Sequence, residues 1–174
     1  MKIGCFQPSK TSMATAYLSL GSNIGDRAAN IRECIARLGS LGHVSRVSSF
    51  YETEPVELRE QPWFLNCVMQ LETRLRPDDL LTSIHRIEAE LGRTRQIMKG
   101  PRTIDIDILL VDWLVVNQNE LHIPHPAMHK RRFVLEPLSE IAPEAWHPVL
   151  ARTARELLHE LRPKDGIVRR LATK

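Results

Sequence analysis

The stretch Gly100-Pro101-Arg102-Thr103-Ile104-Asp105-Ile106-Asp107-Ile108-Leu109-Leu110 joins a stiff turn to a β-branched run that is typical of a buried strand. Side chains alternate along a strand, so the three isoleucines and Leu110 are expected on one face. Asp105 and Asp107 then lie on the other face, about 7 Å apart. Two carboxylates on an apolar strand are costly to bury without a cationic partner. The stretch therefore predicts a cation site, most simply for a divalent metal ion, with a salt bridge from Arg102 as the alternative.

Composition describes an ordinary globular protein. The chain has 174 residues, 43% hydrophobic and 26% charged, which suits one domain that buries its core without disulfides. No apolar run reaches the roughly 18 to 20 residues of a membrane span, and residues 1–12 lack the apolar core of a signal peptide. Three widely spaced cysteines are typical of reduced thiols in the cytoplasm. The net charge of +3 is too small to indicate nucleic-acid binding.

We therefore expect a cytoplasmic monomer whose partners are small molecules, with no nucleic acid and no membrane. Residues 1–15 are expected to be a disordered leader, residues 16–162 a single domain, and residues 163–174 a loose basic tail.

Hydrophobic periodicity predicts the secondary structure. Strands are expected at residues 16–20, 44–51, 63–74 and 104–110, helices at 27–38, 77–91, 131–138 and 153–161, and a hairpin-like stretch at 111–123. This order favours an α+β fold of the ferredoxin-like, split β-α-β kind, with a C-terminal hairpin and helix extension. Its antiparallel sheet is expected to carry helices on one face and to leave the other face open.

Residues 63–74 alternate most clearly, and Phe64 and Asn66 fall on the face opposite the apolar one. An aromatic ring can stack on a planar ligand whose edge an amide binds by hydrogen bonds. The residues alone favour the plainer interpretation, a half-exposed sheet face with one stray aromatic. Phe64, Asn66, Asp105 and Asp107 are expected to meet on the open face.

The charged residues around the aspartates indicate phosphate chemistry. Magnesium is typically held by one or two carboxylates plus substrate phosphates, and arginine matches phosphate oxygens. Basic residues flank the aspartate strand at Arg93, Arg95, Lys99, Arg102 and Lys130 to Arg132. The chain has no Walker A, GxSxG or HExxH motif, so nucleotide chemistry outside the P-loop class is expected. Prolines between His122, His125 and His129 exclude a shared helical face for zinc.

The aspartate stretch resembles the signature of the 6-hydroxymethyl-7,8-dihydropterin pyrophosphokinase family of folate biosynthesis. Further matches follow in the family's order: Tyr17-Leu-Ser-Leu-Gly-Ser-Asn, Ser48-Ser-Phe-Tyr-Glu-Thr-Glu-Pro, Gln61-Pro-Trp-Phe-Leu-Asn66, Arg86-Ile-Glu88, Gly92-Arg-Thr-Arg95, and Pro124-His125 with Arg131 and Phe133. The resemblance covers residues from about 16 to about 148, which is nearly the whole domain.

By this resemblance the protein is expected to transfer pyrophosphate from ATP to the hydroxymethyl group of the pterin and to release AMP. Asp105 and Asp107 would hold two Mg²⁺ ions, and with Arg93 and Arg102 they would be the catalytic residues. The ATP-binding set would be His85, Glu88, Arg93, Arg95, Lys99, Arg102, Ile108, His125 and Arg131. The pterin-binding set would be Gly21, Thr53, Glu54, Val56, Phe64, Asn66 and Phe133, with the pterin between the two phenylalanines.

The chain departs from the family pattern at three places. Met98-Lys99 stands where the family usually has an arginine and an aromatic residue, Glu54 where it often has proline, and Glu120 where some members have a basic residue. Two other functions remain open on this fold. A nucleotidyltransferase would leave pyrophosphate instead of AMP, and an RNA-binding module would need exposed aromatics, which an aromatic fraction of 5% disfavours.

Overall fold

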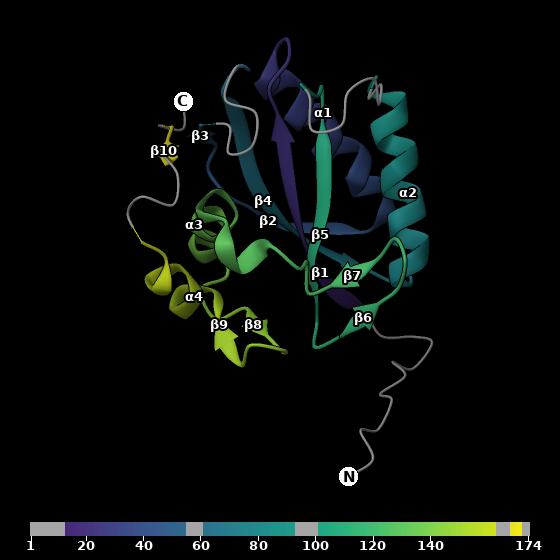
Figure 1. The fold of residues 1–174 in the computed structure, drawn as a ribbon. Helices are drawn as coiled ribbons and strands as arrows, with labels where there is room; N and C mark the ends of the chain where they lie inside the picture. The colour runs from purple at the N-terminus through teal and green to yellow at the C-terminus, as the bar shows by residue number, and fades with distance from the viewer. Residues whose placement is uncertain (1–12, 55–60, 93–100, 163–167, 172–174) are drawn as a thin grey trace.

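The computed structural model describes residues 13–54, 61–92, 101–162 and 168–171. Its centre is a six-stranded antiparallel sheet in the order β10-β3-β4-β1-β5, with β2 also paired to β4 (Figure 1). The sheet strands are β1 (Ala14–Ser22), β2 (His43–Val47), β3 (Tyr51–Thr53), β4 (Phe64–Thr73), β5 (Asp105–Val111) and β10 (Val168–Arg170). The α-helices are α1 (Arg27–Leu38), α2 (Pro77–Glu90), α3 (Arg132–Ile141) and α4 (Ala154–Glu160). This confirms the expected α+β class and the antiparallel sheet.

Two short hairpins complete the described fold. β6 (Val116–Asn117) pairs with β7 (His122–Ile123), as the hairpin-like stretch predicts. β8 (Trp146–His147) pairs with β9 (Arg152–Thr153), which leads directly into α4. At that junction Thr153 and Glu156 form a capping box. None of the helices in the described ranges is long and apolar enough to cross a membrane.

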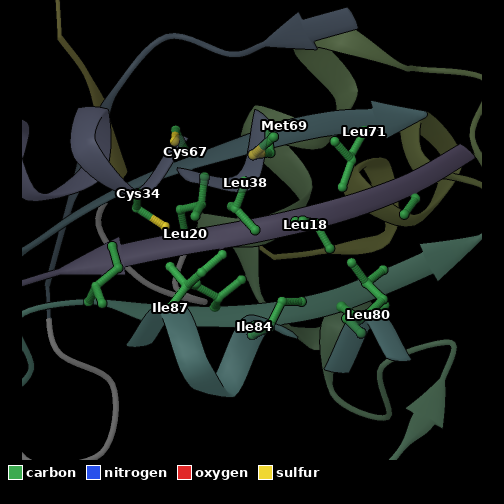
Figure 2. Packing of buried hydrophobic residues seen from close by; sticks show 14 of the residues in the cluster. Leu18, Leu20, Cys34, Leu38, Cys67, Met69, Leu71, Leu80, Ile84 and Ile87 are labelled. Carbon is green, nitrogen blue, oxygen red and sulfur yellow. The ribbon is translucent and has the colours of Figure 1, made fainter. Parts of the chain in front are cut away.

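α1 and α2 pack on one face of the sheet and form the main core. Figure 2 shows the apolar side chains of β1 and β4 meeting those of the two helices. The helical members are Ile31, Cys34 and Leu38 of α1, and Leu80, Ile84 and Ile87 of α2. The helix starts follow from local chemistry, since Asp26 accepts the Ala29 N–H at 2.9 Å and Pro77 opens α2.

α3 and α4 cover part of the opposite face, so the expectation of helices on one face only is wrong. Val68, Leu109 and Leu110 lie on this side and are almost fully buried against α3 and α4. Exposing these three side chains to water would be unfavourable, which explains the second layer. The polar residues Asn66 and Asp105 lie at one end of this face, beside Gly21 near the end of β1.

A β-bulge in β5 changes one predicted side-chain direction. Tyr17 pairs with Leu110 and Leu18 pairs with Ile108, so Leu109 is an extra residue on β5. Leu110 therefore turns to the α3 side, and the prediction that it shares a face with Ile104, Ile106 and Ile108 is wrong. The alternation holds from Ile104 to Ile108, the part that carries the aspartates.

Several element boundaries differ from the predictions. β1 starts at Ala14, inside the expected leader, because Ala14 pairs with Thr73. The strand expected at residues 44–51 is divided into β2 and β3. The Ser48 hydroxyl accepts a hydrogen bond from the Val68 N–H at 3.0 Å, which interrupts the regular main-chain hydrogen bonds to β4. Part of the expected loose tail is β10, an edge strand paired with β3.

Candidate active site

The two aspartates of β5 lie where the alternation predicts, on the sheet face opposite α1 and α2. β5 is an edge strand of the sheet, and its inner neighbour is β1. Arg102 Nη1 donates to Asp105 Oδ2 at 2.5 Å, with both side chains about one quarter exposed. The salt bridge that was the alternative to a metal site is therefore present at Asp105.

Asp107 has a different environment from Asp105. Its Oδ2 lies 3.8 Å from Arg131 Nη1 and 3.9 Å from His125 Nε2, which are looser contacts than the Arg102 pair. Burial and the negative charge of Asp105 raise the pKa of the Asp107 carboxyl to about 6, although Arg131 acts in the opposite direction. A cation between the two carboxylates would relieve this repulsion.

His125 is held in one orientation by its own backbone and by Ala127. The His125 N–H donates to the Leu109 carbonyl at 2.9 Å, which ties the residue to β5. Its Nδ1 accepts the Ala127 N–H at 3.2 Å. Burial and the nearby Arg131 charge lower the pKa of His125 to about 4. The imidazole is therefore neutral at pH 7, with its proton on Nε2, the nitrogen that faces Asp107.

Glu88 is buried beside the same strand. It is 2% exposed, and its Oε1 accepts the Ile106 N–H at 2.8 Å. His85, another residue of the expected ATP-binding set, is exposed on α2. The side chain of Ile108 is buried in the core, which leaves its main chain at the site. Of the expected ATP-binding residues, Arg93, Arg95 and Lys99 lie outside the described residues.

The expected pterin-binding residues Gly21, Asn66 and Thr53 lie together across three strands. Gly21 pairs with Asn66 on one side and with Asp105 on the other, so Asn66, Gly21 and Asp105 form a row across β4, β1 and β5. A Cβ on residue 21 would stand 2.8 Å from Asn66 Oδ1 and 3.8 Å from Phe64 Cδ1. Asn66 Nδ2 donates to Thr53 Oγ1 at 2.7 Å, and both residues are nearly buried.

The remaining expected pterin-binding residues are placed separately. Phe133 lies in the first turn of α3, half-buried, with the Arg131 guanidinium 5.6 Å from its ring centre. Glu54 is half-buried directly after β3, and Val56 lies outside the described residues. Phe64 lies beside the row around Gly21, since a Cβ built on residue 21 would stand 3.8 Å from its ring, whereas Phe133 lies beside Arg131.

Asn23 is a site residue that the sequence predictions missed. It is 2% exposed, its Oδ1 accepts the Arg102 N–H at 2.7 Å, and its own N–H donates to the Arg102 carbonyl at 3.1 Å. Its Nδ2 also donates to Gln61 Oε1 at 3.0 Å. Asn23 therefore joins the end of β1 to the residue that pairs with Asp105. The available signal was its position in the Gly21-Ser22-Asn23 motif.

Comparison with known proteins gives one consistent family. The model of the 7,8-dihydro-6-hydroxymethylpterin-pyrophosphokinase (HPPK) family matches residues 17–143. The Bacillus subtilis 2-amino-4-hydroxy-6-hydroxymethyldihydropteridine pyrophosphokinase is 43% identical over 155 residues, which cover 87% of this chain and 93% of that protein. The Aquifex aeolicus protein of the same name is 40% identical, covering 89% and 94%.

Longer proteins match as well. The chain spans about a fifth of the folic acid synthesis protein of Schizosaccharomyces pombe, at 43% identity over 90% of this chain and 22% of that protein. Among solved structures, a Plasmodium falciparum HPPK-DHPS with pterin and p-hydroxybenzoate matches with a TM-score of 0.70 at 20% identity. That match covers 88% of this chain and 45% of the other, and it supports the overall fold.

Proposed function

The chain belongs to the 7,8-dihydro-6-hydroxymethylpterin-pyrophosphokinase family, and we propose that it transfers pyrophosphate from ATP to the hydroxymethyl oxygen of 6-hydroxymethyl-7,8-dihydropterin. Family membership confirms the resemblance and the class of enzyme, an ATP-dependent diphosphotransferase of folate biosynthesis. The observation that carries the proposal is the row Asn66, Gly21 and Asp105, with Asp107 beside it. In this row the Asn66 amide, proposed for the pterin, lies on the same sheet face as the Asp105 carboxylate, proposed for the phosphates and their metal ions.

Two Mg²⁺ ions are the proposed cofactors, held by Asp105 and Asp107. In the described ranges, no group of three or more His, Cys, Asp or Glu side chains gathers around one point. Two carboxylates on a rigid strand suit magnesium, which keeps waters and takes other ligands from phosphates. The raised pKa of Asp107 supports the same conclusion, because two facing carboxylates gain from a shared cation. When bound, the ions would neutralise phosphate charge and acidify the attacking hydroxyl.

On the ATP side, we assign the triphosphate to the basic groups around β5. Arg102 and Arg131 flank Asp105 and Asp107 and can bind phosphate oxygens through their planar guanidinium groups. The neutral His125 can donate a hydrogen bond from Nε2 to a phosphate oxygen without adding charge. Arg93, Arg95 and Lys99 are proposed for the same role from the family pattern alone.

On the pterin side, we assign recognition to Asn66 and stacking to Phe64 and Phe133. The bond to Thr53 fixes the Asn66 amide, and the absence of a side chain at Gly21 leaves space beside Asn66 Oδ1. Thr53, Glu54 and Val56 would contribute main-chain groups. The chain's residues thus bind both substrates on one sheet face, which supplies proximity and orientation.

The reaction forms one bond and breaks one. The pterin hydroxymethyl oxygen attacks the β-phosphorus of ATP, the bond from that phosphorus to the oxygen bridging the α-phosphate breaks, and AMP leaves with this oxygen. The hydroxyl proton passes to solvent. The arginines and His125 are proposed to hold the phosphate oxygens while charge shifts to the leaving group.

Three further features belong to this proposal. The strand order β3-β4-β1-β5, with α1 and α2 on one face, supports a ferredoxin-like core extended by β10, α3 and α4. We propose that the protein acts as a monomer in the cytoplasm. Its partners would be ATP and the pterin, with no nucleic acid.

Product analysis tests the proposed reaction. The protein is incubated with ATP, Mg²⁺ and 6-hydroxymethyl-7,8-dihydropterin, and the nucleotides are separated by chromatography. AMP in equal amount to pterin diphosphate is expected. Pyrophosphate in place of AMP would identify a nucleotidyltransferase, and no AMP above the control without pterin would exclude the pyrophosphokinase activity. Asp105→Asn is expected to abolish AMP formation, with an unchanged circular dichroism spectrum showing that the fold is intact.

A further inference from the structure

The C-terminal strand β10 forms one edge of the sheet and lies against the shortest strand of it. β3 has only three residues, and it lies between β4 and β10 (Figure 1). Val168 pairs with Thr53 and Arg170 pairs with Tyr51, and the Leu171 N–H donates to the Phe50 carbonyl at 2.8 Å. β3 therefore depends on β10 for the hydrogen bonds of its outer side.

Arg170 joins β10 to the segment before β3 and to α3. Its Nη2 donates to Glu140 Oε1 at 2.8 Å and to Ser49 Oγ at 2.9 Å. The same Glu140 carboxylate accepts the Tyr51 hydroxyl at 2.9 Å and the Ser49 N–H at 3.0 Å. Burial and this carboxylate raise the pKa of Tyr51, so its hydroxyl remains a donor. One arginine thus links β10, β3 and the last turn of α3.

Arg169 contacts the residue that leads into β4. Its guanidinium lies 5.2 Å from the centre of the Trp63 ring, within the range of a cation–π interaction. The Trp63 carbonyl accepts a hydrogen bond from Arg27 at 2.7 Å, and Arg27 also pairs with Glu52 of β3 at 2.9 Å. Trp63 immediately precedes Phe64, so this contact holds the start of β4 beside β3.

These contacts converge on the pterin side of the site. Thr53, the partner of Val168, accepts the hydrogen bond that orients Asn66. We propose that β10, with Arg169 and Arg170, is a positioning element for the pterin: it fixes β3 so that Thr53 holds the Asn66 amide in its binding orientation. The inference rests on the proposed function, and it concerns residues beyond the family match at 17–143.

The position of β10 predicts an effect on one substrate only. β10 lies at the edge of the sheet opposite β5, where Asp105, Asp107 and Arg102 are located. Loss of β10 therefore removes support from Thr53 and Asn66 and leaves the contacts of the β5 edge in place. A strand that served general stability alone would affect both substrates equally.

Two variants test this role: a chain truncated after residue 167, and the full-length chain with Arg170→Ala. Binding of Mg²⁺ with α,β-methylene-ATP, and of 6-hydroxymethyl-7,8-dihydropterin in its presence, is measured by calorimetry. The truncated chain is expected to bind the pterin about tenfold more weakly and Arg170→Ala about threefold more weakly, with the nucleotide Kd within twofold of the parent. In steady-state assays the KM for the pterin should rise by the same factors.

Arg155→Ala is the matched control. Arg155 makes an ion pair with Glu144 at 2.9 Å, and its side chain is 61% exposed, the same exposed fraction as Arg170. It should leave both Kd values unchanged. The proposal is overturned if the truncated chain binds the pterin like the parent, or if both substrates weaken by equal factors. A parent protein that forms no AMP would instead contradict the proposed function.

Discussion

The buried carboxylate of Glu88 accepts a hydrogen bond from the main-chain N–H of Ile106, the residue between Asp105 and Asp107. The bond of 2.8 Å crosses from α2 to the outer edge of β5. It satisfies a main-chain donor at a sheet edge, and it fixes the segment from which both aspartates project. The strand that carries the proposed metal ligands is thus supported from the core side of the molecule.

Replacing Glu88 is expected to weaken both the fold and the proposed metal site. Glu88→Ala leaves the Ile106 N–H without its acceptor, at a cost of about 1 to 3 kcal/mol in the free energy of unfolding. Glu88→Gln keeps a neutral acceptor for the Ile106 N–H, so it should lower the free energy of unfolding by less. Urea denaturation measures stability, and the Mg²⁺ dependence of AMP formation measures the site. Equal stability of Glu88→Ala and the parent would contradict the role of this bond.

Gly21→Ala should act on the pterin side. The new Cβ would stand 2.8 Å from Asn66 Oδ1, so the amide must move from the position that Thr53 gives it. We expect the KM for the pterin to rise about tenfold or more, with little change for ATP. Gly39→Ala is the control, because its Cβ would meet only Val44 Cγ2, at 3.9 Å. An unchanged KM in Gly21→Ala would remove the argument for Asn66.

Neutralising Asp105 or Asp107 should change the stability of the protein by different amounts, although both variants should lose turnover. The Asp107 pKa is raised in the folded state, so its charge opposes folding above pH 6 and ceases to do so as the pH falls below the unfolded value near 3.8. Because its side chain is 37% exposed, solvent screening reduces this cost to about 1 kcal/mol. Asp107→Asn should therefore raise the Tm of the metal-free protein at pH 7 by about 3 °C.

Asp105→Asn provides the contrast, since it removes the charged partner of Arg102 and should give no such gain. Calorimetric melting in EDTA, with and without added Mg²⁺, checks both variants. Added Mg²⁺ should stabilise the parent and neither variant. A lower Tm for Asp107→Asn than for Asp105→Asn would contradict the charge argument.

The buried thiols should be unreactive in the folded protein. Burial raises the pKa of Cys34 from 9.0 to about 12 and raises that of Cys67 as well. The thiolate fraction of Cys34 at pH 8 is then about a thousandfold below that of an unfolded chain, and labelling by iodoacetamide should be correspondingly slow. Peptide mass spectrometry distinguishes the two sites. Fast labelling of Cys34 without urea would show that α1 does not shield it.

The raised pKa of Cys34 also makes the stability of the protein depend on pH. The folded state favours the neutral Cys34 thiol, so its contribution is complete below the unfolded pKa near 9 and is lost as the pH rises towards about 12. The Cm for urea should therefore fall above pH 9. Cys34→Ser should show a smaller fall over this range, because it has no thiol to ionise.

The sequence by itself determined the three long strands β1, β4 and β5, the two core helices and the face on which the aspartates project. Alternation along residues 104–108 and 64–72, the N-cap Asp26 and Pro77 in the first turn of α2 are local patterns, and short-range physics governs them. The family motifs supplied the proposed residues of the site, whereas periodicity alone left Phe64 and Asn66 as ordinary surface positions.

Only the tertiary structure decided how those residues combine. The bulge at Leu109, the cover of the second face by α3, and the pairing of β10 with β3 depend on contacts between segments far apart in the sequence. The same holds for Glu88 on Ile106 and for Asn23 on Arg102. Hydrogen bonds of this kind link residues 18 to 79 positions apart, and no local pattern encodes the choice of partner. The aspartates of residues 100–110 were therefore evident from the sequence, whereas their supports required the fold.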